Sequence, residues 1–252
     1  FSALATFGMS RSRIFSCLIA GITCLAILLV TGCSQKRNQT ESSPARENYS
    51  SGSEPAGFAG ALKTPPAYVG EVKLPDVGRT RQGAAVEMRA QPNGLLLVFF
   101  GYTSCPDVCP TAMSTLRATL KEIGPLAERV EVVMVTIDPV RDTPEALAAY
   151  LEHFFERYRA LRTEDQEALE FAKRVFGVKA EVEGDPSTGD YAIAHTANVF
   201  AVDDRGMLVA EWPHGIRSSL IARDIGVLLQ RFEVDSSRSE SSENNDKKGA
   251  IQ

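Results

Sequence analysis

Two strongly apolar runs separated by a helix-spaced segment constrain the fold of this chain more than any other feature. The runs are LLLVFFGY (95–102) and VEVVMVTID (130–138), and such runs are typical of strands buried on both faces of a sheet. The residues between them place one apolar stripe on a helix: Met113, Leu116, Leu120 and Ile123. This strand, helix and strand succession predicts an α/β fold.

The remaining patterns extend the same alternation. Thr143-Pro144 predicts a helix start, and Thr163 with Gln166 has the spacing of a capping box for a second helix that Gly177 would end. HTANVFAVDDRGMLVAEW (195–212) predicts two strands joined by a hairpin turn, followed by a last helix. The sequence therefore predicts a three-layer sandwich with a central β-sheet and helices on both faces.

A pair of cysteines, Cys105 and Cys109, follows the first apolar run in GYTSCPDVCPT (101–111). A pair at the end of a central strand favours a thioredoxin-like fold. Because a residue before proline avoids the helical region, we expect the loop to persist to Cys109 and the helix to begin at Pro110. The sulfur of Cys109 would then lie at the positive end of that helix, which lowers the pKa of a thiol.

The chemistry of this pair has three interpretations: a redox couple, a soft-metal site or a structural disulfide. Two prolines stiffen the loop, and it holds one residue more than the redox motif C-x-x-C, which favours a metal ion bridging two thiolates. A third ligand should then exist. His153 is predicted at the surface and His214 in a turn, whereas His195 stands at the mouth of a strand. Position alone does not distinguish a ligand from a structural histidine at His195.

The first 33 residues have the shape of a bacterial export signal. Arg11 and Arg13 precede an apolar run of about 17 residues, 14–30, which ends in VTGC. The small residues before Cys33 resemble a lipobox, which predicts lipidation of Cys33, although an uncleaved membrane helix is the alternative. In both cases we expect the domain to be tethered to a membrane of the cell envelope, on the extracytoplasmic, periplasmic side.

The composition of the rest of the chain predicts a linker, a folded domain and a tail. Residues 34–65 and 235–252 are rich in small and polar residues, so we expect a flexible linker and a disordered tail around a folded domain of residues 66–234. The whole chain of 252 residues has a formal net charge of -5. Such a balance argues against a nucleic-acid partner, which requires clustered Lys and Arg.

Three segments resemble, in the same order, signatures of the Sco/SenC family: FFGYTSCPDVCPTAM, VTIDPVRDTPEAL and DYAIAHTANVFAVDDRG. The resemblance covers about residues 66–233 and implies a thioredoxin-like, copper-binding protein that assists assembly of cytochrome c oxidase. It places the copper ligands at Cys105, Cys109 and His195, and it matches Asp138 and RDTP (141–144) without making them ligands. The chain departs from the family at Ala194, where an acidic residue is frequent.

The resemblance implies a metallochaperone rather than an enzyme. Two thiolates and an imidazole suit Cu(I), while Cu(II) with an added ligand, or zinc with water, could use the same residues. The expected client is subunit II of a haem-copper oxidase, and a periplasmic copper carrier or a thiol reductase would act upstream. The alternative is a membrane-tethered thiol-disulfide oxidoreductase that reduces partner cysteines, uses Cys105 as the nucleophile and does not need His195.

Overall fold

The computed structural model describes residues 57–79 and 83–249, with side chains described as far as residue 234. The predicted export signal, with Cys33, and most of the predicted linker lie outside the described residues. Among the helices of these described ranges, none is both long and apolar enough to cross a membrane.

An eight-stranded mixed sheet forms the centre of the described chain, in the order β1-β10-β9-β4-β5-β6-β2-β3. The strands are β1 (Ala61–Tyr68), β2 (Lys73–Asp76), β3 (Ala84–Glu87), β4 (Leu95–Gly101), β5 (Val130–Thr136), β6 (Tyr158–Leu161), β9 (Val199–Val202) and β10 (Met207–Trp212). β4, β5 and β6 are parallel neighbours, and the remaining pairs are antiparallel. Every residue of β4 is buried, as its continuous apolar run predicts.

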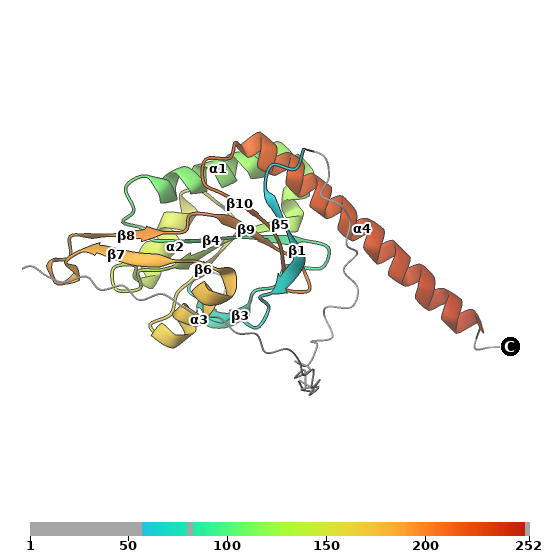
Figure 1. The fold of residues 1–252 in the computed structure, drawn as a ribbon, viewed down its shortest axis with the longest axis horizontal. Helices are drawn as coiled ribbons and strands as arrows, with labels where there is room; N and C mark the ends of the chain where they lie inside the picture. Colours follow the sequence, from blue (N-terminus) through green and yellow to red (C-terminus); the bar gives the residue numbers. More distant parts are fainter. Residues whose placement is uncertain (1–56, 80–82, 250–252) are drawn as a thin grey trace, which may run out of the picture. The chain divides into compact units, whose positions relative to one another are not determined.

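Helices cover both faces of this sheet. They are α1 (Val108–Ile123), the short η2 (Gly124–Arg129), α2 (Pro144–Glu152), α3 (Gln166–Phe176), the short η3 (Pro186–Thr188) and α4 (Ser218–Gly249). α1 and α4 pack against each other (Figure 1). Phe176 at the end of α3 packs against Phe100 and Phe200, whereas the neighbouring Phe99 lies on the opposite face of β4, where its ring contacts His195. The predicted α/β, three-layer architecture is confirmed.

A second, two-stranded sheet consists of β7 (Ala180–Gly184) and β8 (Tyr191–His195), with Ala180 opposite His195. In Figure 1 this hairpin projects to the left of the central sheet. The sequence predicted a loop before His195 and a strand beginning there, so it missed both strands of this hairpin. AEVEG of β7 is mostly exposed and carries no apolar run, and Ile193 is the one buried residue of β8. His195 is therefore the last residue of a hairpin strand.

The folded domain begins before residue 66, which corrects the predicted boundary of the linker. Phe58 stacks on Trp212 with ring centroids 6.2 Å apart, and the N–H groups of Ala59 and Gly60 donate to the buried carboxylate of Asp224. β1 then starts at Ala61 and pairs with β10. Polar and proline-rich composition concealed this strand, since an edge strand tolerates prolines that a central strand does not.

Two further predictions differ from the structure near helix ends. The backbone of residues 235–249 continues α4, where the sequence predicted a disordered tail; extending a packed helix avoids the unfavourable nucleation step that a separate helix faces. The N-cap of α3 is Asp165, which accepts from the N–H groups of Glu167 and Ala168, rather than Thr163. The hydroxyl of Thr163 accepts instead from the N–H of Asp165. Gly177 ends α3 in the left-handed conformation, as predicted.

Candidate metal centre

The two cysteines lie where β4 passes into α1. The helix begins at Val108 after the N-cap residue Asp107, so it includes both Cys109 and Pro110. The prediction that the loop persists to Cys109 is wrong by two residues. Proline is tolerated in the first turn of a helix, where its missing N–H leaves no intrahelical bond unmade.

Gly101, the last residue of β4, makes room for a sulfur. A Cβ atom added at Gly101 would lie 2.9 Å from Sγ of Cys109 and 2.5 Å from Cε1 of Phe99, closer than packed atoms approach. The side chain of Cys109 occupies this space and is completely buried, whereas Cys105 is partly exposed. The absence of a side chain at residue 101 therefore seats the inner sulfur directly on the strand.

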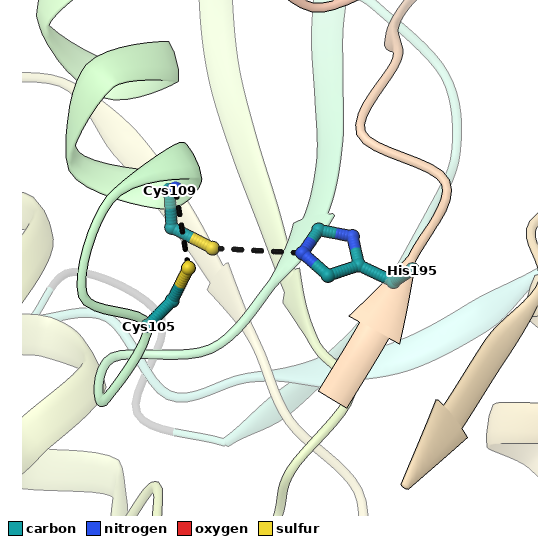
Figure 2. A group of neighbouring side chains, drawn as sticks. All are labelled: Cys105, Cys109 and His195. Carbon is teal, nitrogen blue, oxygen red and sulfur yellow. Dashed lines mark hydrogen bonds between the residues drawn. The ribbon is translucent and has the colours of Figure 1, made fainter. Parts of the chain in front are cut away.

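The structure brings all three predicted ligands together. The Sγ atoms of Cys105 and Cys109 and a ring nitrogen of His195 all lie within 4.8 Å of one another. Nε2 of His195 is 3.7 Å from Sγ of Cys109, and Figure 2 shows the imidazole pointing from the end of β8 toward the two sulfurs. The other two histidines are exposed: His153 follows α2, and His214 lies in the turn after β10, both as predicted.

The helix N-terminus favours ionisation of Cys105 rather than of Cys109, contrary to the prediction. Burial opposes ionisation of Cys105, but the N–H groups of Cys109, Asp107 and Val108 act on its sulfur and lower its pKa overall. The N–H of Cys109 lies 3.4 Å from that sulfur. Burial raises the pKa of the Cys109 thiol strongly. The two pKa shifts differ because the Cys109 side chain points into the core, away from the N–H groups of the first helical turn.

A backbone carbonyl group and two aromatic rings fix the orientation of the His195 ring. Its Nδ1 atom lies 3.1 Å from the carbonyl oxygen of Thr196, and the rings of Phe99 and Tyr102 contact it edge to face at centroid distances of 5.9 and 6.1 Å. A hydrogen bond from Nδ1 to this carbonyl leaves the lone pair of Nε2 facing the sulfurs. The Thr196 carbonyl is the outer partner that many metal-bound histidines have, so an acidic side chain at Ala194 is not required for it.

The loop between β5 and α2 contacts both parts of the site. The buried carboxylate of Asp142 accepts from the N–H and the hydroxyl of Thr103 and from the hydroxyl of Thr136. Burial raises the pKa of this carboxyl. Asp138 and Arg141 of the same loop contact Tyr191 of β8. The sequence indicated Asp138, Arg141 and Asp142 only as matches to a Sco/SenC signature. It gave no indication that Tyr102 or Tyr191 would lie at the site.

Two sulfurs and one imidazole nitrogen form a soft donor set. Thiolate sulfur and imidazole select Cu(I) or zinc over the hard cations, which prefer oxygen. Such a set of three leaves a coordination position that a ligand from another protein can enter. The residues present therefore fit a soft metal ion.

Comparison with known proteins gives one consistent relationship. Residues 79–230 match the SCO1/SenC family. A SCO2-like protein of Rickettsia conorii is 33% identical over 112 residues, which are 44% of this chain and 55% of that protein, so the chain spans about half the length of this curated relative.

Two solved structures resemble the described fold. Apo Sco1 of Thermus thermophilus has a TM-score of 0.58 and 32% sequence identity, covering 68% of this chain and 96% of that one. ScoI of Bradyrhizobium japonicum, solved with copper bound, has a TM-score of 0.53 and 29% identity, covering 65% of this chain and 97% of that one. Since the matched residues 79–230 make up more than half of the sequence and carry both cysteines and the histidine, the chain belongs to the SCO1/SenC family.

Proposed function

We propose that this protein binds one copper ion through Cys105, Cys109 and His195 and passes it to subunit II of a haem-copper oxidase. The observation that carries the proposal is the convergence of three soft donor atoms from two separate parts of the fold within 4.8 Å. Cys105 and Cys109 come from the loop and first turn after β4, and His195 comes from the β7–β8 hairpin.

Cu(I) suits this donor set best, because it accepts low coordination numbers and prefers thiolate ligands. Cu(II) would need an added oxygen or nitrogen ligand. The copper is cargo: a client ligand would enter at the exposed side of the site, next to Cys105, and the protein ligands would leave in turn. The copper-bound relative from Bradyrhizobium japonicum supports copper as the metal.

The place of action belongs to the same proposal. The pattern of residues 9–33 supports export and tethering to a membrane, either through lipid at Cys33 or through an uncleaved helix. A tethered domain on the periplasmic side would meet the extracytoplasmic domain of an oxidase subunit. The Sco/SenC resemblance supports that client, with a copper carrier or a thiol reductase as a further partner.

A second function, thiol-disulfide exchange, is favoured by the contrast between the two thiols. Cys105 is partly exposed with a lowered pKa, and Cys109 is buried behind it. The Cys105 thiolate would attack a partner disulfide and release one partner thiolate, which takes up a proton. Cys109 would then displace the second partner sulfur, so that the pair is oxidised to a disulfide as the partner is reduced to two thiols. His195 has no part in this reaction.

Copper affinity separates the two functions. For this test the 252-residue chain would carry Cys17→Ser, Cys24→Ser and Cys33→Ser, so that Cys105 and Cys109 are its remaining thiols. It is purified in detergent, reduced and titrated without oxygen against a Cu(I) chelator. His195→Ala is expected to weaken Cu(I) binding by about 10-fold or more, while the exposed His153→Ala serves as the matched control.

Two results would contradict the copper proposal. One is Cu(I) binding that is weak or indifferent to His195 while the cysteine pair still exchanges with a disulfide, which favours the oxidoreductase. The other is fully metallated oxidase in cells that carry Cys105→Ala and Cys109→Ala under copper limitation.

A further inference from the structure

The position of His195 raises a physical problem. The β7–β8 hairpin forms a sheet separate from the eight-stranded one in the described chain, and an isolated two-stranded hairpin is marginally stable in water. Two of the candidate ligands belong to the core, but the third lies at the end of β8. Side-chain contacts between β8 and the core must therefore fix the imidazole.

One set of contacts fixes the position of Tyr191, the first residue of β8. Nη1 of Arg141 donates to the carbonyl oxygen of Tyr191 at 2.8 Å, and the guanidinium carbon lies 3.6 Å from the centroid of the tyrosine ring. The hydroxyl of Tyr191 donates to Oδ1 of Asp138 at 2.8 Å. Asp138 and Arg141 are themselves an ion pair. We refer to Asp138, Arg141 and Tyr191 as the clamp.

The acidic member of the clamp is shielded from water, which strengthens the bonds that it accepts. The side chain of Asp138 is 2% exposed and that of Arg141 is 20% exposed. Charge-assisted hydrogen bonds in such surroundings are stronger than bonds between neutral groups at the surface. The guanidinium also lies over the tyrosine face, the favourable geometry of a cation-π contact.

A second contact holds β8 at Ile193, two residues after Tyr191. The N–H of Ile193 donates to the buried hydroxyl of Tyr102 at 3.1 Å. Alternate residues of a strand point to the same face, so Tyr191, Ile193 and His195 share the face of β8 that meets the core. The clamp and this bond thus hold the two positions that precede His195 on that face.

We propose that the clamp positions His195 against the cysteine pair and thereby sets how tightly the centre holds a metal ion. This inference rests on the proposed copper site. The clamp residues are not ligands in it: they act through the hairpin, and the metal affinity they confer depends on the imidazole being present.

Tyr191→Phe is the sharpest test, because it removes only the hydroxyl that reaches Asp138 and leaves the ring beneath Arg141. Tyr158→Phe in β6 is the matched control, since it removes a comparable bond of 2.9 Å to Glu152 of α2, outside the hairpin. In the 252-residue chain with serine at residues 17, 24 and 33, we expect Tyr191→Phe to weaken Cu(I) binding about fivefold, the equivalent of one hydrogen bond. The control variant should bind like the parent.

Two readouts distinguish positioning from general destabilisation. Hydrogen exchange without metal should show faster exchange of the Ile193 amide in Tyr191→Phe and an unchanged rate in Tyr158→Phe. In a His195→Ala background, Tyr191→Phe should cause no further loss of Cu(I) affinity, because coupled residues are not additive. Additive losses, or unchanged affinity and exchange in Tyr191→Phe, would overturn the inference. If the parent chain fails to bind Cu(I), the proposed function fails, and the amide exchange still decides whether the clamp holds β8.

Discussion

The sulfur of Cys109 lies 3.7 Å from Nε2 of His195, although 86 positions separate the two residues in the sequence. Cys109 is fixed in the first turn of α1 and buried against β4. His195 ends a strand that belongs to another sheet. Substitutions in the core should therefore act on the cysteine ligands, whereas substitutions in the β7–β8 hairpin should act on the histidine ligand.

The two thiols should differ in reactivity. With serine at residues 17, 24 and 33, iodoacetamide is expected to alkylate Cys105 well before Cys109, as measured by peptide mass spectrometry. The thiolate is the reactive form, so the lowered pKa of Cys105 shifts the midpoint of its rate profile below that of an ordinary thiol. Burial raises the pKa of Cys109 and also blocks access to it. Equal rates at the two sites would contradict this assignment.

Gly101→Ala should destabilise the fold at the centre. The new methyl group would press on Phe99 and on the sulfur of Cys109, and overpacking of this kind costs about 1–3 kcal/mol in the free energy of unfolding. Gly226→Ala in α4 is the control, because no atom beyond its own stretch of helix lies within 4 Å of the added methyl and alanine favours a helix. Chemical denaturation should show a loss for the first variant and no loss for the second. An unchanged free energy of unfolding in Gly101→Ala would contradict the requirement for glycine beside the Cys109 sulfur.

Asp224→Ala should weaken the attachment of the N-terminal segment. Oδ2 of Asp224 accepts from the N–H groups of Ala59 and Gly60 and from Nε1 of Trp212, at 2.8, 3.0 and 3.0 Å. Leaving such donors without a partner is expected to lower the free energy of unfolding by about 2–4 kcal/mol. Faster proteolysis near Gly57 should accompany the loss. The exposed Asp185→Ala, which also removes an acceptor of backbone N–H, should change stability by less than about 1 kcal/mol.

The N-cap of α3 can be tested by two substitutions. Asp165→Ala is expected to lower the free energy of unfolding by about 1 kcal/mol, because two N–H groups of the first turn lose their acceptor. Thr163→Val keeps the shape and removes only the bond from the N–H of Asp165, so its loss should be smaller. Thermal or chemical denaturation gives the ranking, and the reverse order would restore Thr163 as the cap.

The strands β4, β5, β9 and β10 and most helices were predictable because their signals are local. The run 95–101 is apolar throughout, and the spacing of apolar residues reports which face of α1 is buried. β1 and β7 were not predictable in the same way. Prolines in β1 and exposed glutamates in β7 remove the apolar signal, and only pairing with β10 and β8 makes them strands.

The candidate site was predictable in its residues but not in its electrostatics. Spacing identified Cys105 and Cys109, while His195 rested on the family resemblance, because three histidines are equivalent until the fold places one beside the sulfurs. Which thiol ionises depends on the direction of each side chain relative to the first turn of α1. Sequence spacing does not contain that direction, so the lowered pKa was predicted for Cys109 and found for Cys105.

The division of the centre between two sheets has a consequence for how the protein could be redesigned. Without the segment 180–195, what remains is a dithiol at a helix N-terminus that lacks the nitrogen donor. One continuous segment between α3 and β9 thus supplies the nitrogen donor. Metal selectivity could be altered by substitutions at the end of this segment, with Cys105, Cys109 and the core contacts of Tyr191 and Ile193 left as they are.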